Sequence, residues 1–247
     1  MAADESKPEE VAIPPRVRRL WGLDAPTRKG PRPGLSRDEI VEAAVKIADE
    51  EGLTAVSMSR VASALGYTTM SLYRYVESKD ELVTMMWDHS LAGPTDFDYS
   101  QGWRASLEQW AFIQLRNLRK HPWALDIPIN TPPISPRQLH WMEVGLATLK
   151  ETPLPYAEKL GVILAVTVAV MAEARLTREL AEGDPLSMND YGTLITQLAE
   201  RDTYPHLRAA VDEGVFAFES DDPDEDFAFS LGLTLDGIEK LIHERSA

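Results

Sequence analysis

Apolar residues recur every three or four positions along most of the chain, which is the spacing of one face of an α-helix. The alternation expected of a β-strand does not persist over any long stretch. Breaks containing proline or glycine separate the helical segments, which span residues 36–52, 57–65, 69–76, 78–91, 99–121, 136–151, 155–182, 187–201, 204–214 and 224–245. The pattern therefore predicts an all-α fold.

Two of these segments begin with a capping box, in which a serine caps the helix and a glutamate three residues later bonds back to it. Ser36 with Glu39 opens the first box, and Ser78 with Glu81 opens the second. The helix that begins at Ser78 runs to the break at residues 93–94, and we expect it to be the only rigid connection to the rest of the chain. The residues predicted to be buried on the first helix are Ile40, Ala43, Ala44, Ile47 and Ala48.

The pattern of residues 57–80 predicts two very short helices joined at Gly66, followed by the start of a third. Gly66 can adopt the positive φ of a tight turn, and the small Ala62 lets the second helix cross closely. The predicted buried residues are Val61, Ala62 and Leu65 on the first helix and Leu72 and Val76 on the second. The outward-facing residues are Thr68, Thr69, Met70, Ser71, Tyr73 and Arg74. A protruding helix of this composition suits the major groove of DNA.

The motifs in this region are more specific than the helical pattern. Residues 71–76 read Ser-Leu-Tyr-Arg-Tyr-Val and lead into Lys-Asp-Glu-Leu at 79–82, which fits the pattern Leu-Tyr-x-(His/Tyr)-Val-x-x-Lys. Residues 35–41 (Leu-Ser-Arg-Asp-Glu-Ile-Val) and 48–53 also match. The stretch from 35 to 91 therefore resembles the DNA-binding domain of the TetR/AcrR family of bacterial transcriptional repressors. The remainder resembles the helical ligand-binding and dimerisation domain of that family in pattern only.

The resemblance implies DNA-backbone contacts from Tyr73, Tyr75 and Lys79, and Arg60 on the preceding helix is a further candidate. Tyr75 stands where many relatives have His, so it can donate a hydrogen bond but cannot become cationic. The candidates for reading bases are Thr68, Thr69, Met70, Ser71 and Arg74. Thr68 or Thr69 is also expected to cap the helix, and Arg74 is as well suited to a phosphate as to a base.

The rest of the chain would then supply an effector site and a dimer interface. The candidate ligand-binding residues are aromatic, thioether or polar side chains: Trp87, Trp103, Trp110, Trp123, Trp141, Met142, Met171 and Arg175. Each tryptophan is also open to the simpler interpretation of a core residue. The candidate dimer helices are residues 155–182 and 224–245, where Ala228, Gly232 and Gly237 permit close approach. Both helices are alternatively plain core.

The net charge of −15 at first argues against a polyanionic partner, but the charge is unevenly distributed. Residues 16–34 carry six basic side chains and one acidic side chain, whereas the chain from residue 81 carries 13 basic and 27 acidic ones. The domains are predicted as an arm with little regular structure at 1–34, a DNA-binding domain at 35–92 and a ligand-binding and dimerisation domain at 93–247. The basic residues 28–32 either follow DNA or belong to a disordered solubilising tail.

Several classes of protein are disfavoured. The sequence has no cysteine, its five histidines lie far apart, and the acidic stretch 219–226 lacks the glycine and glutamate positions of an EF-hand. No phosphate-binding, nucleophile-elbow or zinc-protease motif occurs. The N-terminus does not resemble a signal peptide, and the apolar run 160–172 is too short to span a bilayer. We therefore expect a cytoplasmic protein without metal, cofactor, membrane association or enzymatic activity.

The resulting hypothesis is a homodimeric, sequence-specific transcriptional regulator. It would bind a palindromic double-stranded operator as a repressor, and a small apolar or aromatic effector of unknown identity would release it. One alternative is a DNA-binding regulator without an effector, controlled by its concentration or by a protein partner. Another is a sequence-blind DNA-packaging protein, against which the single defined helix-turn-helix argues.

Overall fold

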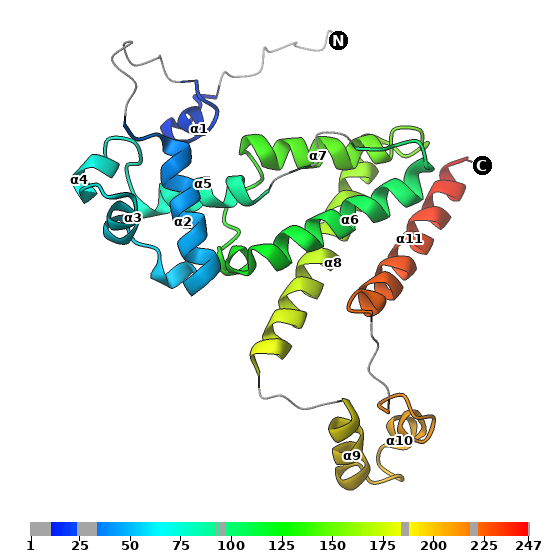
Figure 1. Ribbon diagram of the computed structural model, residues 1–247. Coiled ribbons are helices and arrows are strands. Elements are labelled where there is room, and N and C mark those ends of the chain that lie inside the picture. Colours follow the sequence, from blue (N-terminus) through cyan, green and yellow to red (C-terminus); the bar gives the residue numbers. More distant parts are fainter. Residues whose placement is uncertain are drawn as a thin grey trace. The chain divides into compact units, whose positions relative to one another are not determined.

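The computed structural model describes residues 11–23, 34–91, 93, 97–183, 188–217 and 222–246, and this part of the chain contains helices and no strand (Figure 1). The all-α prediction is confirmed. The helices are α1 Pro15–Leu20, α2 Arg37–Glu51, η1 Leu53–Ala55, α3 Met58–Leu65, α4 Thr69–Leu72, α5 Lys79–Ser90, α6 Gly102–Lys120, η2 Pro122–Asp126, α7 Pro136–Thr148, α8 Tyr156–Glu182, α9 Met188–Leu198, α10 Pro205–Asp212 and α11 Glu225–Ser246.

The chain divides into two compact units, one up to Lys150 and one from Glu151 onward. The first unit contains α1 to α7 and the second contains α8 to α11. Within the first unit, α2 packs against α3 and α5, and α3 packs against α4. We call α2 to α5 the N-terminal bundle. Its centre is formed by fully buried side chains from each helix: Ile40, Ala44, Val61, Leu72, Val76, Leu82 and Met86.

The two predicted capping boxes differ in outcome. The box at the start of α2 is confirmed, because the Ser36 hydroxyl accepts from the Glu39 amide and the Glu39 carboxylate accepts from the Ser36 amide. At α5 only half of the box forms: Ser78 accepts from the Glu81 amide at 3.1 Å. The Glu81 carboxylate instead accepts from the Glu77 amide at 2.7 Å and from Arg19 Nε at 2.5 Å. Its side chain turns away from the cap because a guanidinium from α1 lies beside it.

The predicted irregular arm is wrong for residues 15–20, which form helix α1. Proline at the first helical position favours this start, because its fixed φ suits a helix and its missing N–H has no partner to lose there. Val17 is buried, and the Trp21 indole donates to the Ile134 carbonyl at 2.9 Å. The segment 28–32 lies outside the described residues.

Helices α6 and α7 pack together through two tryptophans. The Trp110 indole donates to the Trp141 carbonyl at 3.1 Å, and the Trp141 indole donates to the Leu91 carbonyl at 3.0 Å. These bonds turn Trp141 and Val144 inward, whereas Leu139 is 36% exposed. The apolar spacing of residues 136–151 predicts that Leu139, Met142, Leu146 and Leu149 are buried. Leu149 is buried, but Leu139 is exposed and Met142 and Leu146 are half-buried, because the indole contacts fix the rotation of the helix.

The prediction that α5 alone connects the N-terminal bundle to the following helices is wrong. Asp49 of α2 accepts from His121 Nδ1 at 2.7 Å and from the Trp123 indole at 2.6 Å, which attaches η2 to the bundle. At the end of α5, Asp88 accepts from the Arg137 amide at 2.9 Å, and the Arg137 guanidinium donates to the His89 carbonyl. Burial and the nearby Arg137 charge lower the pKa of His89.

In the second unit, α8 packs against α11 and α9 packs against α10. The α11 residues Phe227, Leu231, Leu235 and Ile238 recur at helical spacing and are buried on one face. Arg245 bonds Glu158 at 2.6 Å, and this bond lowers the pKa of the Glu158 carboxyl. The small residues Ala228 and Gly237 are exposed, so they are not used in the contact between α8 and α11.

Helix α8 is buried on one face only, which does not fit the alternative of a plain core helix. One face is buried through Val162, Val166 and Val170, while Leu160, Leu164 and Val168 are 44–64% exposed. Among the described residues it is the one helix long and apolar enough to cross a membrane, because the helix extends well beyond the 160–172 run. A single helix of this kind also occurs in water-soluble proteins, and it does not indicate a membrane protein.

Candidate DNA-binding surface

A glycine turn and a threonine cap position α4. Gly66 has φ 75° and ψ 24°, the left-handed conformation, and the following Tyr67 amide donates to the Ala62 carbonyl at 2.9 Å. The Thr68 hydroxyl then caps α4 by accepting from the Ser71 amide at 3.3 Å. Both the positive φ and the threonine cap are as predicted. A helix of four residues is not stable alone, so these local bonds and its buried anchors hold it in place.

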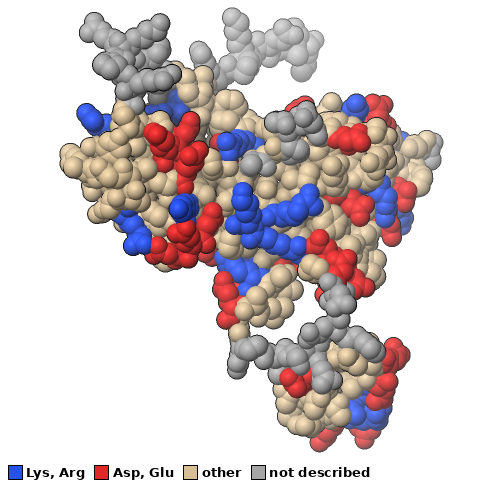
Figure 2. Space-filling view, in the orientation of Figure 1, with Lys and Arg blue, Asp and Glu red and all other residues tan. Residues whose placement is uncertain are grey.

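The anchors leave one face of α4 exposed. Leu72 and Val76 are completely buried, whereas Met70 is 74% and Tyr73 is 44% exposed. Thr68, Arg74 and Lys79 are also exposed, and Thr69, Ser71 and Tyr75 are half-buried. The surface over α4, at the left edge of Figure 2, consists mostly of uncharged residues. The arrangement offers hydroxyl, thioether and phenol groups to a groove, with basic groups at its end.

The surroundings of two predicted DNA contacts, Arg60 and Lys79, include acidic side chains. Arg60 is exposed on α3 and forms an ion pair with Glu51 at the end of α2. Lys79 occupies the first position of α5, where free amides and the helix dipole favour an anion. Asp80 and Glu81 lie in the same turn and carry the opposite charge. The roles of the nine DNA-binding candidates remain predictions.

The turn between α4 and α5 is held by arginines that sequence reasoning missed. Arg37, at the start of α2, donates through Nε to the Tyr75 carbonyl at 2.9 Å. Arg19 of α1 pairs with Glu77 at 2.8 Å and with Glu81 at 2.5 Å. An arginine near a helix start gives no local signal of a partner 38 to 62 residues away. These contacts could not be read from periodicity or motif.

The ligand-binding candidates lie in both units. Trp87, Trp103, Trp110, Trp123, Trp141 and Met142 belong to the first unit, and Met171 and Arg175 to the second. The structure brings Trp110 and Trp141 together, with ring centroids 6.2 Å apart. Trp110, Trp123 and Trp141 are at most 5% exposed, and each indole N–H already has a protein acceptor. Trp87, Trp103 and Met142 are half-buried, Met171 is half-buried, and Arg175 is exposed.

A small hollow occurs between α9 and α10, with a volume of about 190 Å³. Its lining includes Thr193, Thr196 and Phe216, and the Tyr191 and Phe216 rings meet edge to face at 5.5 Å. None of the predicted ligand-binding residues lines it. Within the described residues, no group of histidines and carboxylates is arranged to hold a metal ion.

A capped helix-turn-helix in a structure whose described elements are all helices defines a DNA-binding protein, and comparisons with known proteins identify its family. Residues 40–86 match the family model described as bacterial regulatory proteins of the tetR family. Residues 95–242, more than half of the chain, match the model of the tetracyclin repressor-like C-terminal domain. The chain belongs to the TetR family of transcriptional regulators, whose members bind operator DNA, dimerise and bind small molecules, and are not enzymes.

Individual relatives agree with this assignment. The chain is 36% identical to the HTH-type transcriptional repressor DrrR1 of Streptomyces coeruleorubidus over 92% of this chain and 85% of the relative. Apo ActR from Streptomyces coelicolor has a similar fold, with a TM-score of 0.71, 23% identity, and coverage of 87% of this chain and 99% of ActR. ActR in complex with actinorhodin has a TM-score of 0.70, 24% identity and coverage of 83% and 95%.

Proposed function

We propose that this chain is a homodimeric repressor whose α4 enters the major groove of a palindromic operator. The observation that carries this proposal is the exposed face of α4, which includes Met70 and Tyr73. The buried side chains of Leu72 and Val76 anchor this face to the bundle. Tyr75 and Lys79 at its end would contact phosphates and fix the register, and Thr69, Ser71 and Arg74 would contact base edges. Repression is supported by the 36% identical repressor DrrR1.

The dimer would form through α8 and α11. Their shared contact buries one face of each helix and leaves an outer apolar stripe exposed: Leu160, Leu164, Val168, Leu176 and Leu180 on α8 with Phe229 and Leu233 on α11. Two copies that cover these stripes would form a four-helix interface. Two-fold symmetry would then present two α4 helices to half-sites one DNA turn apart, about 34–36 Å.

A small apolar or aromatic ligand would release the repressor from DNA. ActR, a fold neighbour, forms a complex with actinorhodin, which supports a small-molecule effector for this chain as well. The aromatic and thioether candidate residues favour an apolar or aromatic one. The half-buried Trp87, Trp103 and Met142 are the candidates in the first unit whose side chains retain accessible surface. The protein would act in the cytoplasm, where operator DNA is found.

The effector would act through the contacts between the N-terminal bundle and the α6–α7 pair. The Asp49 bonds to η2 and the Asp88–Arg137 bond to α7 attach the bundle at two separate points. A ligand that prefers a different position of α6 or α7 would therefore also change the position of α4. It can shift the equilibrium only by its differential affinity for the two positions.

Selection of bound duplexes from a random pool tests the DNA-binding proposal. We expect an enriched palindrome with half-sites in one-turn register, protected on one face of the helix in a footprint. Enrichment of no common sequence would contradict it and would instead indicate sequence-blind binding.

The effector is tested separately on the selected operator. Actinorhodin is added as the first probe, followed by a panel of planar aromatic compounds, and release is measured by fluorescence anisotropy. A regulator that no compound releases would support the alternative of control by concentration or by a protein partner.

A further inference from the structure

Helix α1 lies before both family-model matches, which begin at residues 40 and 95. It nevertheless docks on the N-terminal bundle. Val17 is 5% exposed, and the Arg19 side chain is 15% exposed although its guanidinium is charged. Arg16 is exposed on the same helix. One basic residue of α1 is therefore enclosed while another faces solvent.

Arg19 compensates a carboxylate that has been removed from water. The Glu81 side chain is 7% exposed, and its two oxygens accept from Arg19 Nε at 2.5 Å and from the Glu77 amide at 2.7 Å. A second arm of the same guanidinium reaches the exposed Glu77 carboxylate at 2.8 Å. An ionised carboxylate that is this buried requires such a partner, because removing one member of a buried pair leaves an uncompensated charge.

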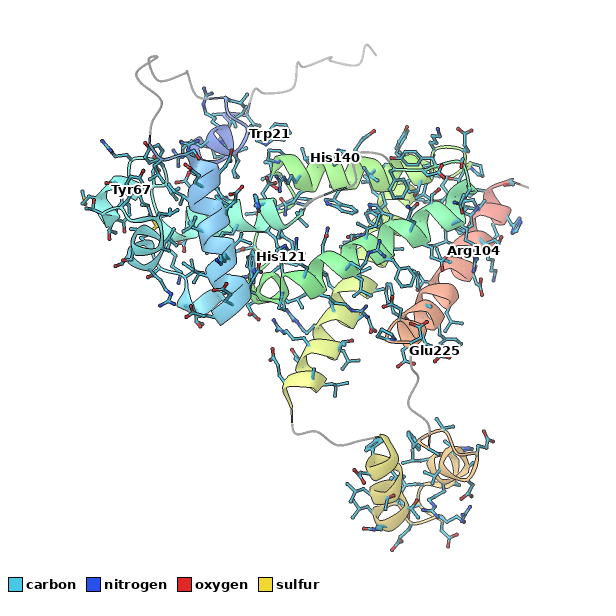
Figure 3. All side chains as sticks on the ribbon, in the orientation of Figure 1. Trp21, Tyr67, Arg104, His121, His140 and Glu225 are labelled. Atoms are coloured by element: carbon cyan, nitrogen blue, oxygen red, sulfur yellow. The ribbon has the colours of Figure 1, made fainter. Side chains whose placement is uncertain are left out.

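The backbone of α1 holds the same turn from the other side. The Arg19 carbonyl accepts from Arg37 Nη1 at 3.4 Å, and Arg37 Nε donates to the Tyr75 carbonyl at 2.9 Å. The next residues lead away from the bundle, since Trp21 reaches the Ile134 carbonyl just before α7 (Figure 3). Helix α1 thus bridges the end of the DNA-reading segment and the start of α7.

We propose that Arg19 is a positioning residue for operator binding. By holding Glu77 and Glu81, it fixes the turn from residue 75 to 81 and therefore the placement of Tyr75 and Lys79 relative to α4. Arg19 itself does not touch DNA. This inference rests on the operator binding proposed above.

The test is operator affinity of the full-length Arg19→Met variant, measured by anisotropy well below its melting temperature. We expect about tenfold or more weaker binding, because the uncompensated Glu81 moves into water and takes the turn with it. The slope of log affinity against log salt stays that of the wild type, because no phosphate contact is lost. Adding Glu81→Gln removes the buried charge, keeps an acceptor for the Glu77 amide, and restores affinity to within about threefold.

The control is Arg16→Met, which removes the same charge from the exposed side of α1 and is expected to change affinity by less than about twofold. Should Arg19→Met fail to fold, Arg19→Lys and the double variant with Glu81→Gln carry the test. Lysine keeps the charge but cannot reach both carboxylates with a planar fork, so we expect an intermediate loss.

Three outcomes would overturn the inference. One is an Arg19→Met variant with a lower melting temperature but unchanged operator affinity, which would indicate that Arg19 has a purely structural role. Another is a reduced salt slope without rescue by Glu81→Gln, which means that Arg19 contacts phosphate directly. A third is a loss of operator affinity in Arg16→Met as large as the loss in Arg19→Met. If the wild-type protein itself selects no operator, the proposed function fails, and that result is distinct from all three.

Discussion

Asp49 holds two parts of the first unit together through a single carboxylate oxygen. Its Oδ1 accepts from both the His121 ring and the Trp123 indole. Figure 3 labels His121 beside α2. Because an ionised carboxylate can only accept, His121 must carry a proton on Nδ1. The His121 side chain is 9% exposed, and that of Asp49 is 31% exposed. The bond is therefore partly shielded from water.

Replacing Asp49 with alanine is expected to lower the free energy of unfolding by about 2 kcal/mol or more, because two buried donors lose their acceptor. Urea denaturation of the full-length protein measures this loss. The matched control is Glu50→Ala, whose side chain is 60% exposed and forms a surface ion pair with Lys46 at 4.0 Å. That change is expected to stay within about 0.5 kcal/mol. Equal losses in both variants would show that Asp49 does not attach η2.

The predicted DNA contact of Lys79 can be tested by a single substitution. Lys79→Ala is expected to weaken binding to operator and scrambled duplexes by a similar factor and to reduce the salt slope by about one per half-site. Lys46→Ala is the control, since Lys46 is 76% exposed on α2 and outside the predicted surface. Titrations at four salt concentrations give both slopes. A loss confined to the operator would instead place Lys79 among the base-reading groups.

At the scale of elements, α4 depends on its neighbours more than on its own sequence. Four residues form too few hydrogen bonds to offset the free-energy cost of helix nucleation. The Thr68 cap, the Gly66 turn and the buried Leu72 therefore provide the stabilisation that helix propensity does not. The turn is the most sensitive of these features. An L-residue at Gly66 would have to adopt φ 75°, which is unfavourable for any side chain with a Cβ.

Gly66→Ala is therefore expected to lower the free energy of unfolding by about 1 kcal/mol. Operator affinity should fall as well, because relief of the strain reorients α4. Ser63→Ala, at an exposed position of the same short helix, is the control and is expected to be neutral or slightly stabilising. Denaturation and anisotropy on both variants make the comparison. If Gly66→Ala changes neither the free energy of unfolding nor the operator affinity, the turn tolerates rearrangement.

Elements with local signals were predictable, and those set by distant contacts were not. Ser36, Gly66 and Thr68 act within three or four residues, so cap and turn chemistry located them correctly. The buried face of α7 was misjudged because indole bonds from Trp110 and Trp141 determine how that helix is rotated. Glu81 was predicted to complete a capping box, because no local sequence pattern indicates that its carboxylate pairs with Arg19 instead.

At the scale of the whole molecule, the exposed apolar stripe of α8 and α11 is the feature that a monomer leaves unexplained. Leu164 is 64% and Phe229 is 70% exposed, and both lie on the side turned away from the buried contact between these helices. The strongly negative net charge of −15 makes non-specific attraction to DNA weak. Binding would then depend on two correctly spaced copies of α4.

Leu164→Glu is expected to convert the dimer to monomers at micromolar concentration, because a carboxylate would have to be buried without a partner. Affinity for the full palindrome should then fall towards that for one half-site. Sedimentation velocity and gel shift measure the two effects. Leu198→Glu on α9, where the leucine is 77% exposed, is the matched control and should remain dimeric. A Leu164→Glu protein that stays dimeric would place the interface elsewhere.

The sequence by itself determined the all-α class, the limits of most helices and the exposed face of α4, because caps, turns and helical periodicity act over a few residues. Tertiary structure alone decided that Arg19 meets Glu81, that Asp49 meets Trp123 and that α8 keeps an exposed apolar face. These pairings join residues 62 or more positions apart, and no local energy term distinguishes one such partner from another.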